Sequence, residues 1–441
     1  MKKFISTLAI LVASWHAYAQ KSDSVFMGAN YANEIYYKLS GGQVKSEPVK
    51  NWDLSFSAVG SFDERFFAIR ANYSNGVRVY EYPKFGTSDW SSFDTTGWNG
   101  WIQQYNTDSS WWFGAFNREP YSHPSYSWGA YTNSGVISGN RLYLIGFTPD
   151  AFSPPNTFKK LWIEERKSSS GVRTWKFKYA DVDGSNVTSV TINDADYPAK
   201  NFAYYSLRDG KALDREPANS QNSWDIVFTR YWADLQNPTF PYYQVTGVLT
   251  NVNSEVIKAT GLPVKDMVKP AITDTRFSNH MNVIGYNWKN SGPGGTTIED
   301  STAYFIKVDS TVAGAVVNTK IYKLWFTDFG GSANGKTVFN TELVTEVKNT
   351  TSIHGVKAKP TLSVYPNPAQ EAITITTANI DAKPIAVNIH DISGKLVYST
   401  PINSNTNWGV YTLDVSAFAK GVYVVSLVTD KEALFQRVVK Q

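Results

Sequence analysis

Apolar and polar residues alternate with a period of two along most of the chain from Ser24 onward, which is the pattern of strands with one buried face. The alternation is clear in FFAIRANYSNGVRVYEY, residues 66–82, and in RTWKFKYADVDGSNVTSVTI, residues 173–192. Asn75-Gly76 and Asp183-Gly184 interrupt these runs and predict two-residue hairpin turns. Helical periodicity is weak after the first residues. The pattern therefore predicts an all-β fold of antiparallel strands.

The first residues follow a different pattern. MKKFISTLAILVASWHAYAQ has two lysines, an apolar run and then Ala17-Tyr18-Ala19, which together predict a secretory signal peptide over residues 1–19, cleaved after Ala19. No later apolar run approaches the roughly 20 residues that a membrane-spanning helix needs, so no transmembrane segment is expected in the mature chain. The chain has no cysteine, which excludes disulfides, a lipid-modified amino-terminal Cys and a Cys nucleophile.

The body of the chain contains an internal repeat. NEIYYKLSGGQVKSEPVKNWDLSF, residues 33–56, aligns with NFAYYSLRDGKALDREPANSQNSWDIVF, residues 201–228, and the triplet Lys-Leu-Trp ending at Trp162 recurs at Trp325. The offsets are 204 − 36 = 168 residues at the Tyr-Tyr pairs and 325 − 162 = 163 residues at the triplets. Nearly constant offsets predict two diverged copies of one antiparallel β domain, residues 24–195 and 200–348, because solenoid repeats are much shorter.

Each copy carries a Trp-Asp pair followed by alternating apolar residues. The alternation places Trp52 inside a strand, so that it shares a face with Leu54 and Phe56. Asp53 then points to the opposite face. The same reading applies to Trp224-Asp225 in the second copy. Core packing with a turn hydrogen bond is the favoured interpretation, since buried aromatic residues are more often structural than ligand-binding.

The carboxyl end carries several spaced motifs. Residues 349–360 have the composition of a linker, and the chain then alternates with turn signals to predict a sandwich of about seven strands over residues 361–441. Tyr365-Pro366-Asn367-Pro368-Ala369, Asp391-Ile392-Ser393-Gly394-Lys395 and Gly421-Val422-Tyr423 occur in this order. The segment closely resembles the type A sorting domain that Bacteroidetes use in type IX secretion. This resemblance implies export to the cell surface or release from the cell, with the type IX machinery as a partner.

Composition narrows the possible partners. The net charge is +4, and removing the signal peptide with its two lysines leaves 4 − 2 = +2, so nothing indicates a nucleic acid or an anionic membrane as a partner. Aromatic residues make up 15% of the chain, close to the 18% that are charged. This supplies many rigid apolar groups for half-buried strands or for flat ligands.

The second copy resembles a known family more closely than the first. Its Tyr-Tyr strand, the segment WDIVF, the pair Arg230-Tyr231 and the late run Lys-Leu-Trp-Phe are similar to the HmuY-like haem-binding proteins of Bacteroidetes. That resemblance implies a secreted or surface hemophore-like protein that holds haem between two axial His or Met side chains and passes it to an outer-membrane haem receptor. The usual member is a single-domain lipoprotein, whereas this chain has two copies, no lipid-anchoring Cys and a sorting domain.

Few residues could ligate haem iron, since haem needs apolar walls, cations for its propionates and axial His or Met. Candidate axial ligands in the second copy lie between predicted strands; they are Met267, His280 and Met281. Arg276 is a nearby cation, and Tyr286 and Trp288 are candidate walls. In the first copy the comparable residue is His123. The alternative is that these residues are ordinary loop side chains.

The segment from Asp89 to Tyr131 is rich in tryptophan and has no counterpart in the second copy. Trp98, Trp101, Trp111 and Trp112 lie there among Gly, Ser, Asn and Asp. Such side chains could form a sugar-stacking platform, which predicts an adhesin or glycan-binding protein with these rings exposed and coplanar. The alternative is that the segment covers one end of its domain. A third possibility is that both copies have lost an ancestral ligand and act as spacers.

Motifs of catalysis are missing from the sequence. No G-x-S-x-G, H-E-x-x-H or Walker A pattern occurs, and the histidines are scattered without a spaced acidic partner. Glu164 and Glu165 are adjacent on a predicted strand and so point to opposite faces, which does not suit a paired acid and base. We therefore expect a binding protein and not an enzyme.

Overall fold

The computed structural model describes residues 20–59, 65–117, 125–133, 135–150, 153–169, 171–237, 241–292, 295–312, 315–348, 361–378, 383–402, 410–431 and 433–441. Antiparallel strands dominate these residues, and the only α-helix among them is α1 (Ser220–Ser223). The all-β prediction is confirmed. The predicted signal peptide, 1–19, and the predicted linker, 349–360, lie outside the described residues.

The first body is built from residues close together in sequence. A large sheet with the order β13-β12-β11-β10-β6-β7, extended by β8 and β9, faces a smaller sheet with the order β15-β14-β4-β5. Buried residues from Leu54 to Leu207 form one hydrophobic core between them. The strands are β4 (Leu54–Ser57), β5 (Ile69–Ala71), β6 (Val77–Glu81), β7 (Gln103–Gln104), β8 (Gly129–Asn133), β9 (Val136–Gly139), β10 (Tyr143–Phe147), β11 (Thr157–Ser169), β12 (Val172–Asp181), β13 (Thr188–Asn193), β14 (Phe202–Ser206) and β15 (Lys211–Leu213).

The second body combines the two ends of the repeat region. One sheet has the order β1-β23-β22-β21-β18, another has the order β17-β16-β2-β3, and β19 and β20 form a separate hairpin. Its core joins Val25 to Leu39 with residues between Ile226 and Phe339. The strands are β1 (Lys21–Phe26), β2 (Asn33–Lys38), β3 (Gly42–Pro48), β16 (Ile226–Asp234), β17 (Tyr242–Thr250), β18 (Ser254–Thr260), β19 (Lys289–Gly292), β20 (Gly295–Ile298), β21 (Thr302–Val312), β22 (Ala315–Phe329) and β23 (Lys336–Lys348).

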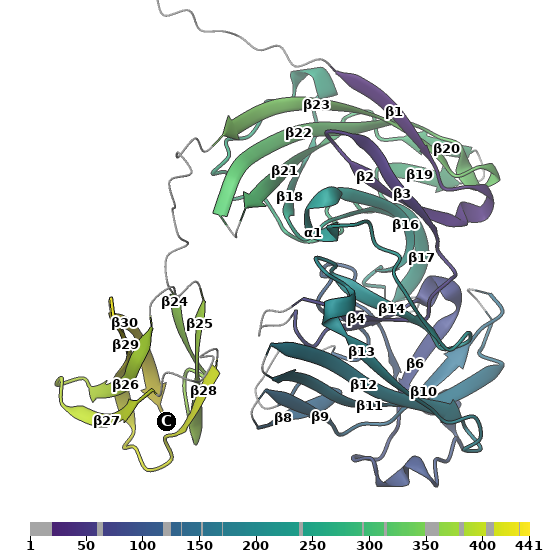
Figure 1. Cartoon of the computed structure of the whole chain (residues 1–441). Coiled ribbons are helices and arrows are strands. Elements are labelled where there is room, and N and C mark those ends of the chain that lie inside the picture. Colours follow the sequence, from purple (N-terminus) through teal and green to yellow (C-terminus); the bar gives the residue numbers. More distant parts are fainter. Residues whose placement is uncertain are drawn as a thin grey trace, which may run out of the picture.

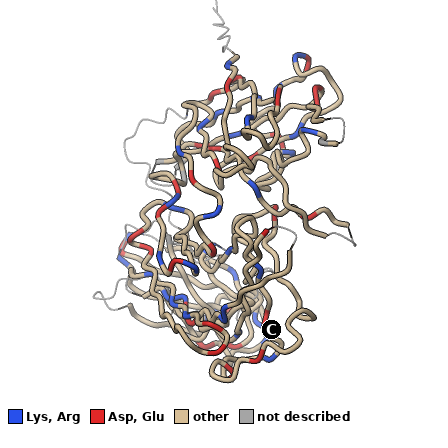
Figure 2. Tube along the Cα trace, turned by 90° about the vertical axis from the view of Figure 1, so that its right-hand side faces the viewer, with Lys and Arg blue, Asp and Glu red and all other residues tan. Residues whose placement is uncertain are grey.

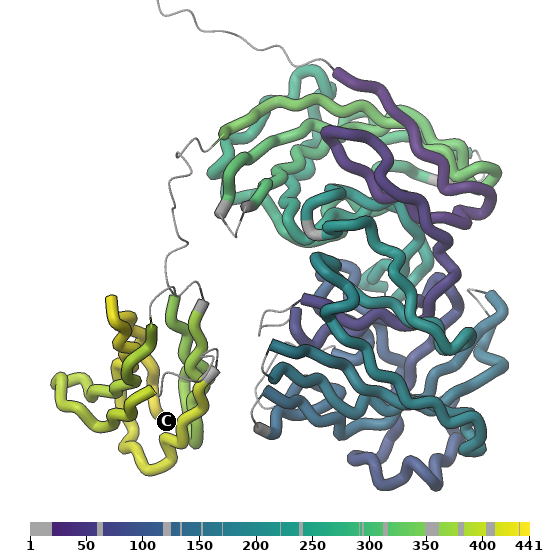
Figure 3. The backbone as a smooth tube through the Cα atoms, in the orientation of Figure 1, coloured from purple at the N-terminus to yellow at the C-terminus, as the bar shows by residue number. Residues whose placement is uncertain are grey.

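The two sequence copies exchange strands. β2 of the first copy pairs with β16 of the second, with Tyr37 opposite Ile226, and β14 of the second copy pairs with β4 of the first, with Tyr205 opposite Leu54. β1 also leaves its own copy and pairs with β23, the last strand of the second. In Figures 1 and 3 the purple amino-terminal strands accordingly lie beside the green strands near residue 340. The two cores therefore do not coincide with the two sequence copies: residues 20–49 complete the second core.

The exchange explains the repeated Tyr-Tyr pairs. Neighbouring residues of a strand point to opposite faces. Tyr37 lies in the second core and Tyr205 in the first, while Tyr36 and Tyr204 point toward the seam between the two bodies. Each pair thus places one ring in the core of its body and the other ring on the face that borders the seam cavity.

The Trp-Asp pairs complete the same junction. Trp52 and Trp224 lie just before β4 and β16 and pack at the seam, whereas Leu54 and Ile226 enter the cores. The prediction that each tryptophan shares a face with the following aliphatic residue was wrong, because the strand begins only after the aspartate. Asp53 accepts a hydrogen bond from the amide of Arg208, so it caps the turn after β14.

Asp225 does the equivalent for the other hairpin. Its carboxylate accepts hydrogen bonds from the amide of Leu39, at 2.8 Å, and from the ammonium of Lys38, at 2.6 Å. Both carboxyl groups are buried, and desolvation raises the pKa of each one despite these donors. Core packing with a turn hydrogen bond, the favoured interpretation of both pairs, describes these contacts, except that the turn belongs to the other copy.

The two predicted hairpin turns have different outcomes. Asp183-Gly184 lies in the connection between the paired strands β12 and β13, so the hairpin is present, but the connection runs from residue 182 to residue 187 and is longer than the predicted two-residue turn. Asn75-Gly76 does not join a hairpin, because the short helical turn at Tyr73–Asn75 leads from β5, which pairs with β4, to β6, which pairs with β10. Figure 2 shows basic and acidic residues interspersed over the described trace, in keeping with the small net charge.

The carboxyl-terminal domain is a small two-sheet structure. One sheet has the order β24-β25-β28 and the other β27-β26-β29-β30, so the predicted seven-stranded sandwich is present. Its core includes Ile375, Ile389, Val425 and Leu427. The strands are β24 (Thr361–Tyr365), β25 (Ala372–Ala378), β26 (Pro384–Asp391), β27 (Leu396–Pro401), β28 (Val410–Asp414), β29 (Gly421–Thr429) and β30 (Ala433–Lys440).

Candidate functional site

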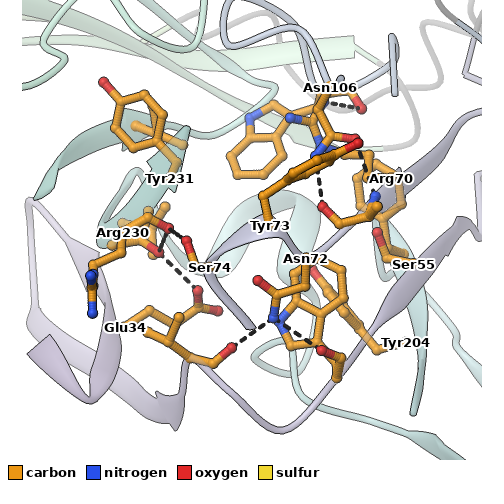
Figure 4. A pocket seen from close by; sticks show the side chains of 18 of the residues that line it. Glu34, Ser55, Arg70, Asn72, Tyr73, Ser74, Asn106, Tyr204, Arg230 and Tyr231 are labelled. Atoms are coloured by element: carbon orange, nitrogen blue, oxygen red, sulfur yellow. Dashed lines mark hydrogen bonds between the residues drawn. The ribbon is translucent and has the colours of Figure 1, made fainter. Parts of the chain in front are cut away.

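A cavity of about 90 Å³ lies at the seam between the two bodies. Both cores contribute to it, with Arg70, Tyr73 and Asn106 from the first body and Glu34 and Arg230 from the second (Figure 4). Each water needs roughly 10–15 Å³ of such space, so the cavity has room for several waters. Sites for drug-sized ligands are usually about 300–1,000 Å³, so this cavity is much smaller than a typical ligand pocket.

Aromatic pairs related by the repeat frame the cavity. Tyr36 meets Trp224 edge to face with 5.1 Å between ring centroids, and Tyr204 meets Trp52 in the same way at 4.9 Å. In each pair the tyrosine comes from one sequence copy and the tryptophan from the other. Tyr36–Trp224 thus joins the two copies within the second body and Tyr204–Trp52 joins them within the first, and each contact is of a type that contributes about 0.5–1.5 kcal/mol beyond area burial.

A buried polar network crosses the seam. Arg215 donates to Glu34 at 2.6 Å, and Glu34 also accepts hydrogen bonds from the hydroxyls of Tyr36 and Thr229. Burial opposes the charge on Arg215, but the neighbouring Glu34 carboxylate raises its pKa overall. Glu216 lies on the same wall and accepts hydrogen bonds from the amide of Asn201 and the hydroxyl of Tyr204, while burial raises its pKa. These contacts hold the side chains of the cavity wall in place, which favours a structural role for them over ligand binding.

A loop of the first body bridges to the second, and Arg70 shapes it. The Arg70 guanidinium donates to the carbonyls of Thr107 and Ser110, and burial lowers its pKa to about 10. The loop then contacts the second body directly. The Trp111 indole donates to the carbonyl of Thr250 at 2.7 Å, and the amide of Met281 donates to the carbonyl of Ser109 at 2.9 Å.

Two indole N–H groups on the cavity wall have no hydrogen-bond partner in the described structure, those of Trp52 and Trp232. A buried donor without an acceptor costs about 1–3 kcal/mol. Water molecules in the cavity would accept from both groups, which agrees with its size.

An open cleft of about 620 Å³ lies elsewhere on the first body, within the usual size range of ligand sites. We call it the Trp101 cleft. Trp101 is half-buried on its wall and contacts Tyr82 edge to face at 5.4 Å, and Ile102 beside it is 70% exposed. Its lining consists of Glu81, Tyr82, Pro83, Gly100, Trp101, Ile102, Gln104, Ala115, Phe116, Ser125, Ser127, Arg141 and Tyr143.

Polar side chains border the aromatic wall of the Trp101 cleft. Glu81, at the end of β6, forms a 2.8 Å ion pair with Arg141, which precedes β10. Both are partly exposed, with 36% and 27% of their side-chain surfaces accessible. A carboxylate and a guanidinium next to apolar rings can exchange hydrogen bonds with a hydroxyl-rich ligand whose flat face lies on the rings.

The structure does not assemble the four tryptophans of the predicted platform. Trp98 packs on the outer face of the large sheet, 4.8 Å from Phe158, and Trp101 lies next to it in the same cluster. Trp111 and Trp112 lie at the seam, where Trp112 stacks on Phe202 at 5.5 Å. All four are partly buried. The prediction of one coplanar exposed platform was therefore wrong, because the loop after residue 104 turns toward the second body.

The candidate haem ligands of the second copy also separate. Met267 is buried among Ile257 and Phe305 on the outer face of its sheet, whereas Met281 lines the seam cavity among residues of a different cluster. His280, beside Met281, is exposed. The described structure therefore does not bring Met267 together with His280 or Met281. Haem binding itself stays a prediction from the resemblance.

Arg276 and Trp288, two of the remaining haem candidates, already make contacts with other side chains of the fold. Arg276 is exposed and pairs with Asp274 at 2.7 Å, and this carboxylate raises its pKa. Trp288 is buried in the second core, stacked on Phe326 at 3.9 Å, and Tyr286 is half-buried nearby in sequence. His123 lies outside the described residues. In the part of the chain that is described, no group of three or more His, Cys, Asp or Glu could hold a metal ion.

Sequence reasoning missed the polar residues of both sites. Arg70 and Arg141 sit in ordinary alternating strands or loops, and nothing in their local sequence marks them. The repeat is the sequence signal nearest to the seam, because the two Tyr-Tyr strands occupy equivalent positions in the two copies. It would locate the seam only if the exchange of strand partners were already known. The partner of each strand is not readable from a period-two pattern.

Comparison with known proteins supports one part of the chain. Residues 363–441 match the family model described as a secretion system C-terminal sorting domain. No curated protein matches the chain. The resemblance of the body to HmuY-like proteins gains no support from these comparisons. In the described residues no helix has the length and apolar character needed to cross a membrane. The predicted type IX sorting domain is thus confirmed, and it indicates export through the outer membrane to the cell surface or beyond.

Proposed function

We propose that this protein is an exported carbohydrate-binding protein that holds a glycan, without turnover, in the Trp101 cleft. The observation that carries the proposal is the open cleft of about 620 Å³ with Trp101 on its wall and the Glu81–Arg141 pair at its rim. Export through the outer membrane supports it, because glycans are abundant outside the cell and a surface protein meets them directly.

The chemistry of the cleft favours a saccharide over a purely apolar ligand. Trp101, which is half-buried, offers apolar ring surface to the C–H face of a sugar, and the buried ring of Tyr82 packs against it edge to face. Arg141 offers only donors, and Glu81 when ionised offers only acceptors, so together they complement hydroxyl groups that do both. Their existing ion pair keeps both side chains in place before a ligand arrives, which reduces the entropy lost on binding.

Other tryptophan faces in this region are already in use. The ammonium group of Lys178 lies 4.3 Å from the Trp162 ring centroid and 4.8 Å from that of Trp90, and Lys160 lies 5.0 Å from Trp90. These cation–π contacts rigidify the outer face of the sheet. Among these aromatic residues it is Trp101, with Tyr82, that lines the open cleft.

A glycan array followed by calorimetry of the hits tests the proposal. We expect Trp101→Ala to weaken binding by about tenfold or more, because a central aromatic side chain dominates such interfaces. Arg141→Gln, which keeps the fold-bearing aromatics, should weaken it by a smaller factor. Tyr243→Ala removes an aromatic residue that is 46% exposed outside the cleft and should leave affinity unchanged.

Two results would contradict the proposal. One is a wild-type protein that retains no glycan on the array. The other is glycan binding that survives both Trp101→Ala and Arg141→Gln. Absorbance titration with ferric and ferrous haem tests the alternative function in the same preparation: a saturable shifted Soret band lost in Met281→Ala would support haem capture at the seam.

A further inference from the structure

A second open cleft, of about 450 Å³, lies where the two bodies meet, and we call it the seam cleft. Residues 148–150 and Asn75 reach it from the first body, while Arg230 on β16 and Gln244 on β17 reach it from the second. Lys50 comes from the segment in which the chain crosses between the bodies, and Arg208 from the turn after β14. The cleft is separate from the Trp101 cleft, with which it shares no lining residue.

Positive charge predominates in the seam cleft. Lys50, Arg208 and Arg230 line it, against one carboxylate, Asp150. Arg208 is neutralised by Asp53, a fully buried carboxylate behind the cleft. Counting the three cations against the carboxylates of Asp53 and Asp150 gives a net charge of 3 − 2 = +1 in and directly behind the cleft.

Two of the cations have no acidic partner in the described structure. The Arg230 guanidinium donates to the carbonyl of Asn30 at 3.2 Å and to the side chain of Gln244, both of which are neutral. Lys50 is exposed and forms no ion pair or side-chain hydrogen bond among the described residues. Asp150 is engaged with Ser153, whose amide and hydroxyl donate to it at 2.8 and 2.6 Å.

The position of Arg230 adds to this argument. It lines both the seam cleft and the inner seam cavity, and its guanidinium is held by neighbours from two segments, so its direction is fixed. Partial burial lowers the pKa of Arg230, which reflects the cost of keeping its charge there without a carboxylate. A negatively charged group in the cleft would remove that cost.

We infer that the seam cleft binds an oxyanion, a carboxylate, sulfate or phosphate group of an extracellular ligand, with Arg230 and Lys50 as its donors. Guanidinium and ammonium groups bind such anions through short charge-assisted hydrogen bonds. Since residues 148–150 of the first body and Arg230 of the second line the cleft together, the site exists only when both bodies are assembled. The inference does not depend on the Trp101 cleft.

The test is direct titration of the full mature chain with three probes: inorganic sulfate, inorganic phosphate and a galacturonate trisaccharide. Binding is followed by NMR chemical shifts at low ionic strength, since sulfate stabilises proteins in general and thermal shifts would mislead. We expect Lys50→Gln to weaken the bound probe by about fivefold and Arg230→Gln by about tenfold or more. Asp150→Asn removes the opposing charge and should tighten binding.

The controls separate this site from general charge effects. Lys265→Gln makes the same charge change on an exposed lysine outside the cleft and should leave affinity unchanged. Trp101→Ala should also leave it unchanged, so failure of the glycan proposal and failure of this one are distinguishable. Lys50 makes no contact that the fold needs, so its variant remains informative if Arg230→Gln does not fold.

The outcomes decide both the site and the source of the anion. If the trisaccharide binds more tightly than both inorganic ions, the cleft is assigned to acidic glycans. If sulfate or phosphate binds at least as tightly as the trisaccharide, the cleft is assigned to free or esterified sulfate or phosphate. The inference is overturned if no probe saturates with the wild-type chain, or if Lys50→Gln and Arg230→Gln bind as the wild type does.

Discussion

The two bodies reach similar architectures by different chain paths. The first is continuous, with its core formed by residues between Leu54 and Leu207, whereas the second needs residues 20–49 to complete a core that otherwise begins at Ile226. β13 closes the first large sheet and β1 closes the second, each against the last long strand of its body. The comparison shows that a tandem repeat can close on itself, with the first segment of the chain serving the last unit.

The joints at which these closing strands attach differ in chemistry. In the first body Arg166 forms two hydrogen bonds with Asp194, at 2.7 and 2.8 Å, and both side chains are buried. At the repeat offset, 166 + 163 = 329, the second body has Phe329, which stacks on Tyr31 with 6.0 Å between centroids. The same joint is thus fastened by a buried ion pair in one body and by aromatic stacking in the other.

Deleting residues 20–49 should have the largest effect and should affect the two bodies differently. It removes the core side chains Val25, Met27, Ile35, Tyr37 and Leu39 from the second body. At about 1.5–3 kcal/mol for each buried side chain, the loss is on the order of 10 kcal/mol, as large as the whole stability of a typical domain. We expect the second body to unfold while the first retains protected amides in hydrogen exchange.

A synthetic peptide of residues 20–49 provides the control for this deletion. Added in excess, it should restore protection in β16 and β23, the strands with which it pairs. Loss of protection throughout the first body, with none left in its large sheet, would show that the two bodies do not fold separately.

Substitution at the joints should have the next largest effect. Asp194→Ala leaves the buried guanidinium of Arg166 without its carboxylate and should lower the free energy of unfolding by about 3–5 kcal/mol. Phe329→Leu loses ring stacking but keeps apolar contact and should lower it by about 1 kcal/mol. Urea denaturation measures both, and equal losses would contradict the distinction between the two joints.

The Trp-Asp carboxylates should respond alike in the two bodies. Asp53→Ala and Asp225→Ala each remove an acceptor from a backbone amide of the other copy, and each should cost about 2–3 kcal/mol. The matched Asn variants keep an acceptor and should cost less than about 1 kcal/mol, because the cations left behind, Arg208 and Lys38, are partly exposed and can be hydrated. Costs that differ strongly between the two bodies would show that the exchange is not symmetric in energy.

The pH dependence of these carboxyl groups follows from their raised pKa values. Each binds its proton more tightly in the folded chain than in the unfolded chain, where the pKa is about 3.9. Their contribution to the free energy of unfolding is therefore fully present below pH 4 or so and is lost as the pH rises through the folded pKa. In urea denaturation from pH 4 to 8, the free energy of unfolding of the wild type should fall relative to that of Asp225→Asn as the pH increases.

A circular permutant should have the smallest effect. Moving residues 20–49 behind residue 348 through a flexible linker, so that the chain begins at Lys50, makes the second body continuous as well. β1 runs antiparallel beside β23, with Lys21 opposite Thr341, so a linker of about ten residues spans the gap at about 3.3 Å per residue. We expect a folded protein with a midpoint of urea unfolding close to that of the wild type, and a permutant that fails to fold would contradict the exchanged topology.

Sequence patterns predicted a large share of this protein because they depend on local physics. Period-two alternation predicted strands wherever one face is buried, and ordered motifs after residue 360 predicted the sorting domain that is now confirmed. The repeat predicted two related units. The alternation with turn signals predicted a hairpin at Asn75-Gly76 that the structure does not have. That error came from assuming that strands adjacent in sequence also pair in space.

Tertiary structure alone decided the partners. The side chains of a strand reveal which face is buried but not which other strand supplies its hydrogen bonds, so the exchange between β2 and β16 could not be read from the sequence. The same limit applies to the sites. Trp101 and Arg141 line one cleft because β6 pairs with β7 and with β10 inside the first body, whereas Lys50 and Arg230 line another cleft where the two bodies meet. The sequence determined the strands, the repeat and the sorting signal; the pairing of strands distant in sequence, within the first body and between the two copies, determined where the clefts lie.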